Sequence, residues 1–444
     1  MESPIDRFTE ALNSRGRNVR RTGICTLINE VRKGNLSSPT FVNNVNNHIH
    51  TTYSFSPYSP TRAVWEAYRA GLQSAGIMDH DSICGAEEFI EAGAIAGIAT
   101  TIGIECRTDF SSTPLAGQRI NNPDQLSNAY IAIHGIPHNH IETFKNYFSP
   151  YIETRNERNK LMTDRINILL ASYGIGLDYV NDVLPLSNYN NGGTVTERHL
   201  LFALGRKMTA AFGKGKRILS FLKRDLGLAV SPDTAERLRE ENNPYFNYDL
   251  LGVLKGEFSK AFYIDATNEC PDVHEVLSFS KKCCCIAAYS YLGDITTSIT
   301  GDKRPQKFED DYLDELIVLL KELGIEAVTY MPARNTDTQL SRIMALCRKF
   351  DLLEFSGEDI NSPRQPFVRD LMRKNGFHHL IDATWALIGH EYEATLDNEN
   401  AFFAPRTVKK HPDLNERIHY FKTIGLRTME KSRLIARTEE GAVS

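Results

Sequence analysis

Short apolar runs alternate with amphipathic stretches along most of this chain, and the two patterns predict strands and helices in turn. Early in the chain, helices are expected at 61–72 and 85–96, each between two apolar runs. The expected strands are residues 45–50, 75–78, 98–106, 129–134, 261–264, 283–289, 326–330 and 352–355. Short strands that alternate with helices are typical of parallel β/α architecture, so we expect an α/β barrel.

The alternation is interrupted once, by a long stretch that carries only helical patterns. We expect this stretch to be a helical domain inserted between two halves of one barrel. The predicted domains are a helical extension at 1–44, a first barrel half at 45–145, the helical insertion at 146–250, a second barrel half at 251–400 and a carboxyl-terminal tail at 401–444. The tail is charged after Gly425, and we expect it to fray.

Composition narrows the classes of protein to consider. A hydrophobic content of 41% and a charged content of 24% are those of an ordinary soluble globular protein. The net charge of −5 argues against binding of nucleic acid over the whole surface and favours a small substrate. A local basic groove for nucleic acid stays an open alternative, because net charge averages over all faces. No apolar run is long enough to span a bilayer, and the first residues lack the apolar centre of a secretion signal. We therefore expect a cytoplasmic protein with no membrane partner.

Ionisable residues stand where the predicted strands end. His48 and His50 lie two residues apart on the first strand, and a strand's period of two places both side chains on one face. The full set is His48, His50, His80, Glu105, His134 and Asp359. In a β/α barrel the carboxyl ends of the strands surround one mouth, where the active site lies. Imidazoles together with carboxylates suit zinc, manganese or iron, so the set predicts a metal site.

Each histidine taken alone has a simpler interpretation. A single histidine at a strand end is usually a solvated loop residue or a hydrogen-bonded core residue, and one H-x-H pair is a weak motif. His138 and His140 form such a pair beyond a strand end, and we expect them at the surface. The placement of the six residues at successive strand ends is what favours metal binding.

Several short segments together resemble one known family. They are His48–Ser54, Met78–Ser82, Gly103–Glu105, Ile133–Gly135, Arg155–Asp164, Thr196–Leu204 and Gly357–Asn361. In this order they are similar to the motifs of the PHP (polymerase and histidinol phosphatase) superfamily, in its metal-dependent phosphoesterase branch. The resemblance implies a distorted, seven-stranded (β/α)7 TIM-like barrel that binds up to three divalent ions.

The resemblance also implies how ligands are shared among the ions. His48, His50, Glu105 and Asp359 would form the first site. Glu105 would join His134 in the second, and His80 would belong to a third.

The chain departs from the family pattern at four positions. Phe55, Tyr289 and Asn361 stand where the family has ligands, and Glu197 stands where it has a phosphate-gripping arginine, with Arg198 beside it and His199 retained. Loss of charged or imidazole ligands lowers the affinity for the later ions. We therefore expect one tightly bound ion and a weaker second, with manganese, zinc or iron as the candidates.

The working hypothesis is hydrolysis of a small phosphate ester, such as a nucleotide or sugar phosphate, through water activated by a divalent ion. Asp359 would act as ligand and proton acceptor, and His199 would reach the phosphoryl group. The arginines expected to hold phosphate are Arg198, Arg334 and Arg364. Three alternatives stay open: a degenerate barrel that binds a ligand or partner without turnover, a hydrolase of amides or other esters, and an insertion that serves as an interaction module.

Overall fold

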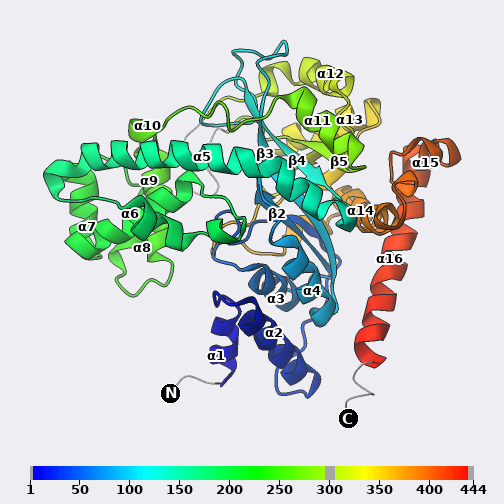
Figure 1. Ribbon diagram of the computed structural model, residues 1–444, viewed down its shortest axis with the longest axis horizontal. Coiled ribbons are helices and arrows are strands. Elements are labelled where there is room, and N and C mark those ends of the chain that lie inside the picture. The colour runs from blue at the N-terminus through cyan, green and yellow to red at the C-terminus, as the bar shows by residue number, and fades with distance from the viewer. Residues whose placement is uncertain (1–3, 296–305, 439–444) are drawn as a thin grey trace.

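Seven strands form one sheet that nearly closes into a barrel in the computed structural model, which describes residues 4–295 and 306–438. The strands follow the order of the chain: β1 (Asn46–Ile49), β2 (Ser74–His80), β3 (Ala99–Asp109), β4 (Asn128–His134), β5 (Ile286–Ser290), β6 (Ala327–Tyr330) and β7 (Leu353–Ser356). A parallel bridge between Ile49 and Ile360 returns the sheet to its first strand. The predicted α/β barrel of seven strands with a helical insertion is thereby confirmed (Figure 1).

One strand runs against the expected direction. We expected parallel strands throughout, but β4 pairs antiparallel with both β3 and β5. The connection between β3 and β4 forms turns and contains no helix, so the chain turns back beside β3 instead of crossing over to start a parallel strand. The carboxyl end of β4 therefore lies at the opposite end of the sheet from the carboxyl ends of its neighbours.

The helical insertion is longer than its predicted range. It comprises α5 (Ile141–Leu170), α6 (Glu197–Phe212), α7 (Lys216–Ser220), α8 (Pro232–Arg239), α9 (Phe246–Glu257) and α10 (Ser259–Phe262). These helices gather on one side of the barrel, with α5 reaching across to it (Figure 1). The strand expected at 261–264 is wrong, because the chain there completes α10 and packs Phe262 into the core of the insertion.

Five further helices cover the outside of the barrel. They are α3 (Pro60–Arg69), α4 (Ala86–Ala96), α11 (Val273–Lys282), α12 (Leu313–Leu323) and α13 (Asp337–Lys349). Local signals set their ends: the Ser59 hydroxyl accepts a hydrogen bond from the backbone of Arg62 at the start of α3, and Pro60 occupies its first turn. At the end of α4, Gly97 adopts a φ of 71°, which favours glycine.

Alternate residues of a strand face different layers. On β5, Ala288 packs inside the barrel with Phe355, whereas Tyr289 packs among the outer helices with Leu316. Side chains two apart on any strand therefore meet on the same side, which decides which ionisable residues reach the barrel mouth.

Helices at both ends of the chain pack onto the barrel. The amino-terminal segment contains α1 (Pro4–Ala11) and α2 (Arg17–Arg32). We expected a fraying tail after Gly425, but that residue lies inside α16 (Leu414–Thr438), which packs along α14 (His378–Leu396). A short helix, α15 (Pro405–Lys410), lies between them in the chain. Across residues 4–295 and 306–438, no helix has both the length and the apolar character needed to cross a membrane.

Candidate metal centre

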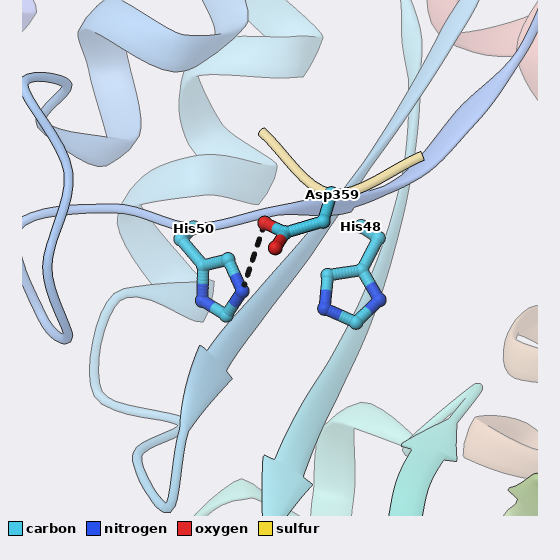
Figure 2. A group of neighbouring side chains, drawn as sticks. All are labelled: His48, His50 and Asp359. Atoms are coloured by element: carbon cyan, nitrogen blue, oxygen red, sulfur yellow. Dashed lines mark ion pairs between the residues drawn. The ribbon is translucent and has the colours of Figure 1, made fainter. Parts of the chain in front are cut away.

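The predicted ligands of the first three strands meet at one mouth of the barrel. His48 lies on β1 with His50 just beyond its end, and His80 and Glu105 stand in register on β2 and β3. Asp359 reaches the same place from the loop after β7. Figure 2 shows its carboxylate beside the rings of His48 and His50.

Two overlapping groups of side chains have ligand atoms close enough to share an ion. His48, His50 and Asp359 form one group, and His50, His80 and Glu105 form the other, with ligand atoms within 4.8 Å of one another. His50 Nε2 lies 3.4 Å from Asp359 Oδ1, and His80 Nδ1 lies 3.3 Å from Glu105 Oε2. His48 Nε2 lies 3.7 Å from the same Glu105 oxygen, which links the two groups.

His50 is held in place by a chain of hydrogen bonds behind the site. Its Nδ1 lies 3.2 Å from the hydroxyl of Ser54, which donates to Asp79 Oδ1 at 2.6 Å. Because the single hydroxyl hydrogen goes to Asp79, the hydroxyl oxygen accepts from Nδ1–H, and Nε2 keeps its lone pair toward Asp359. Thr51 donates to Asp79 through both its backbone N–H and its hydroxyl. The sequence showed Asp79 only as a neighbour of His80, so this positioning role was missed.

The electrostatics favour neutral imidazoles at most of these positions. Burial lowers the pKa of His50, and burial together with the nearby His50 lowers that of His80 well below its usual value. Burial also acts to lower the pKa of His48, but the carboxylates of Glu105, Asp359 and Asp79 together outweigh it and the pKa is raised. Neutral imidazoles and carboxylates are the donors that zinc, manganese and iron accept. The residues present therefore fit a divalent cation.

His134 lies deeper in the barrel than predicted. Because β4 is antiparallel, His134 pairs with Gly103, two residues before Glu105 on β3. Its ring packs 4.7 Å from that of Phe355, and burial lowers its pKa to about 3. Among the described residues it belongs to neither ligand group, although its Nε2 is buried without a hydrogen-bond partner there.

A cavity of about 790 Å³ opens beside the clustered ligands, between the insertion and the loops after β5, β6 and β7. Asp359, whose side chain is 34% exposed, lines it together with Arg198, Arg334 and Arg364. The structure thus brings the three predicted arginines to one space that also contains a predicted ligand. His199 does not line it.

The sequence matches the PHP domain family over residues 46–329, which is well over half of the chain and includes His48, His50, His80 and Glu105. The chain belongs to the PHP domain family. Two curated relatives match over short segments only. The error-prone DNA polymerase of Nocardia farcinica is 42% identical over 60 residues, which are 13% of this chain and 5% of that polymerase. The 5'-3' exoribonuclease of Haemophilus influenzae is 36% identical over 63 residues, which are 14% of this chain and 23% of that enzyme.

Two solved structures resemble the fold distantly. One is a proposed metal-dependent phosphoesterase from Bifidobacterium adolescentis, with 19% identity, a TM-score of 0.46, and coverage of 76% of this chain and 96% of that one. The other is an amidohydrolase from Chromobacterium violaceum with bound sulfate and no metal, with 14% identity, a TM-score of 0.47, and coverage of 73% and 90%.

Phe55, the first departure from the PHP pattern, connects the barrel with the insertion. Phe55 packs into the insertion core, with its ring centroid 5.0 Å from that of His199 and 5.8 Å from that of Phe202. His199 Nδ1 accepts a hydrogen bond from the backbone of Thr196 at 3.0 Å, and burial lowers the His199 pKa to about 3. The structure does not support the predicted catalytic role, because this histidine caps α6 and is buried against Phe55.

Two other departures differ in their consequences. Tyr289 points away from the site, and its hydroxyl donates to Glu309 at 3.1 Å, so equating it with the PHP histidine is wrong. Neighbouring residues of a strand face opposite sides of the sheet, so Ser290 faces the side opposite to Tyr289. The Ser290 hydroxyl is buried without a hydrogen-bond partner in the described part of the chain. Asn361 remains at the site, where its amide donates to both oxygens of Asp359 at 2.8 Å.

A buried network of arginines and carboxylates lies beside His80. Its members are Arg107, Arg155, Arg158, Asp81, Glu197 and Glu269. Arg155 Nη1 lies 2.5 Å from Asp81, and Arg158 Nη2 lies 2.5 Å from Glu197. Three guanidinium groups face three carboxylates, so the network is neutral. Glu197, at the PHP arginine position, is part of what neutralises it.

Proposed function

We propose that the protein is a metal-dependent phosphoesterase that hydrolyses a small phosphorylated substrate. Membership of the PHP family supports the broader class of metal-dependent hydrolases. The observation that carries the finer proposal is the position of Asp359. This residue faces His50 at the ligand cluster and also lines the cavity that contains Arg198 and Arg334.

In this proposal His48, His50 and Asp359 hold one divalent cation, with manganese, zinc or iron as candidates. A bound cation supplies a Lewis acid and lowers the pKa of water. Asn361 orients the Asp359 carboxylate through its two hydrogen bonds, and the exposed part of that carboxylate accepts a proton from the attacking water. The second group shares His50 and so holds a further cation more weakly, because one imidazole cannot serve both sites fully.

The cavity arginines would bind the phosphate. Guanidinium groups form paired, charge-assisted hydrogen bonds with phosphate oxygens, which fixes the orientation of the group as well as its affinity. Arg334 follows β6 and Arg364 follows β7, so both approach the ligand cluster from the barrel side, while Arg198 approaches from the insertion. A substrate between them would be held from two sides.

The test begins with metal content. The purified full chain is stripped, reconstituted with Mn²⁺, Zn²⁺ or Fe²⁺, and compared with His50→Ala and Asp359→Ala for bound metal. The exposed His274 and Asp164 provide matched controls as His274→Ala and Asp164→Asn. We expect one tightly bound ion in the wild type and in both controls, and its loss in both site variants. A wild type that binds no ion after reconstitution would contradict the proposal.

Substrate class is tested with a panel on the reconstituted protein. It contains a nucleoside monophosphate, a sugar phosphate, a short RNA oligonucleotide with a 5' phosphate, and an amide substrate. We expect release of inorganic phosphate from a small ester, dependent on His50. The RNA is included because two relatives act on nucleic acids by name. Release of amine alone would replace the phosphoesterase proposal with that of an amide hydrolase.

A barrel that binds a ligand without turnover is the second candidate. It is motivated by Phe55, which fills a ligand position of the PHP pattern with an apolar ring, and by Asn361, which replaces a histidine there. The two proposals differ in one measurement. A chain that binds one ion and a phosphorylated compound, yet releases no phosphate from any ester of the panel, would favour the second.

A further inference from the structure

Asp81 directly follows the ligand His80 and has an unusual backbone conformation. Its φ is 51°, in the left-handed region that residues other than glycine rarely adopt. The backbone N–H of Asp81 still donates to the carbonyl of Glu105 at 3.0 Å, so the bend comes where β2 leaves β3. Such a conformation persists only where the surrounding structure holds it.

An arginine of the insertion holds the Asp81 side chain. Arg155 lies on α5, the helix that reaches from the insertion to the barrel (Figure 1). Its Nη1 lies 2.5 Å from the Asp81 carboxylate, and the two side chains are only 3% and 4% exposed. Arg155 Nε lies 3.1 Å from Glu269, which fixes the same guanidinium group. A buried carboxylate needs such a partner, so the position of Asp81 depends on that of α5.

The insertion also contacts the loops that follow the first two strands. The Ser82 hydroxyl, in the loop after β2, donates to the carbonyl of Gly192 at 2.7 Å. In the loop after β1, the carbonyl of Tyr53 accepts a hydrogen bond of 2.7 Å from the backbone of Thr194. The insertion is therefore attached to the barrel at the strand ends that carry ligands.

The two groups of ligands differ in how far they depend on these contacts. The His50 ring is fixed from within the barrel, through Ser54 and Asp79. His80 has Nδ1 3.3 Å from Glu105, but within residues 4–295 and 306–438 no hydrogen bond fixes its ring from behind. The direction of His80 therefore depends on the backbone at its own end of β2.

We propose that Asp81 and Arg155 position His80, so that the insertion completes the second cation site, which is the group formed by His50, His80 and Glu105. The inference rests on the further cation of the proposed function and gives the insertion a task that does not involve the substrate. Asp81 and Arg155 are positioning residues, because they act on the cation only through His80.

Calorimetric titration of Zn²⁺ into the metal-stripped full chain separates the two cations. We expect a tight and a weaker binding event in the wild type, and His80→Ala should remove only the weaker one. Arg155→Met should weaken the weaker event roughly ten-fold or more and leave the tight one unchanged. Electrostatics alone predicts the opposite sign, because loss of a nearby positive charge strengthens cation binding. An unchanged or tighter weaker event in Arg155→Met would overturn the proposal.

Arg158→Met is the matched control for the loss of a buried arginine. Arg158 lies on the same helix and also contacts Glu269, but it faces Glu197 instead of Asp81. Both variants should unfold at lower urea concentration, since each leaves buried carboxylates with one partner fewer. Only Arg155→Met should weaken the second cation. Equal weakening by both variants would assign the effect to a loosened insertion and overturn the positioning role.

Two substitutions of Asp81 test the backbone directly. Both remove the same carboxylate, but alanine disfavours a φ of 51° whereas glycine adopts it freely. Asp81→Ala should weaken the second cation roughly ten-fold or more, and Asp81→Gly should retain most of the wild-type affinity. An equal loss in the two variants would overturn the proposal.

These titrations require no turnover, so they are decided separately from the proposed function. A wild type that binds two cations and hydrolyses no ester would contradict the proposed function, and the variants would still decide how His80 is positioned. A wild type that binds a single cation would overturn the inference even if it hydrolyses esters.

Discussion

Substitution of Asp79 by asparagine tests whether the hydrogen bonds behind His50 prepare the site. In the folded protein the Asp79 carboxylate accepts from Thr51 N at 2.6 Å, Thr51 Oγ1 at 2.5 Å and Ser54 Oγ at 2.6 Å. All three donors are buried, and an asparagine amide presents an N–H₂ group toward at least one of them. That donor loses its acceptor, and Ser54 no longer fixes the His50 ring.

The size of the effect follows from the number of bonds lost. One unsatisfied buried donor costs about 1–3 kcal/mol, so we expect Asp79→Asn to lower the unfolding free energy of the metal-free protein by that amount. Loss of a hydrogen-bonded group behind a metal ligand typically weakens metal binding about 10- to 100-fold. We expect a change of this size for Zn²⁺ or Mn²⁺, because the His50 tautomer is no longer selected.

The assay compares three proteins by calorimetric titration of metal and by urea unfolding without metal. The matched control is Asp164→Asn on the exposed face of α5, which should behave like the wild type in both. A folded Asp79→Asn protein that binds metal with wild-type affinity would refute the argument that Asp79 positions His50. Unchanged unfolding would refute the estimate for the buried donors.

Three further changes test packing and charge elsewhere. Burial raises the pKa of Glu309 from 4.5 to about 7, so between these pH values the folded protein retains a proton that the unfolded chain releases. The free energy of unfolding should therefore fall by up to about 3 kcal/mol as the pH rises from about 4.5 to about 7. Urea unfolding of the wild type and of Glu309→Gln measures this change. Gly425→Ala places a methyl group 2.1 Å from the Trp385 carbonyl oxygen and should cost about 1–3 kcal/mol or more in thermal unfolding. Arg20→Ala leaves buried Glu88 without its ion-pair partner and should cost about 3–5 kcal/mol in urea unfolding.

Each of these changes has a control in the same chain. Gly376→Ala meets no atom within 4 Å, so a loss as large as that of Gly425→Ala would contradict the packing argument. Arg17→Ala removes a largely exposed pair with Glu91 and should cost less than about 1 kcal/mol. Burial also raises the pKa of Glu326 to about 7, so Glu309→Gln should flatten the pH dependence only in part. An unchanged pH dependence would contradict the assignment to Glu309.

The part of the site that sequence could predict is the part set by local geometry. His48 and His50 share a face because a strand repeats every two residues, and His80 and Glu105 pair with each other on neighbouring strands that start in register. These relations hold within a few residues of each strand end. They bring the side chains together whatever the rest of the fold does.

The misplaced residues depend on features that a strand pattern does not contain. His134 lies deeper because β4 runs antiparallel to its neighbours. An apolar run in the sequence does not distinguish a parallel strand from an antiparallel one. Tyr289 points outward because it stands one residue away from the inward-facing positions of β5, and neighbouring residues of a strand face opposite sides. His199 caps its own helix, and the spacing from Thr196 to His199 was available as a capping signal.

The cavity could not be derived from the sequence as a single space. Arg198, Arg334 and Arg364 come from three elements far apart in the chain, and only the packing of the insertion against the barrel brings them together. The pattern identified them as possible phosphate ligands one by one. It contained no information on Asp249, the buried carboxylate of the insertion that pairs with Arg364.

The seam of the barrel has a consequence for how the molecule closes. The backbone N–H of His50 donates to the carbonyl of Ile360 at 2.9 Å, and the N–H of Ile360 donates to the carbonyl of His48 at 2.9 Å. The backbones that join the sheet's two ends therefore belong to His48, to His50 and to the residue next to Asp359. A cation held by His48, His50 and Asp359 would link the first strand to the segment that follows the last strand. In the metal-free chain the amides of His50 and Ile360 would exchange with solvent sooner than those inside β2 and β3, and loading with metal would slow them most.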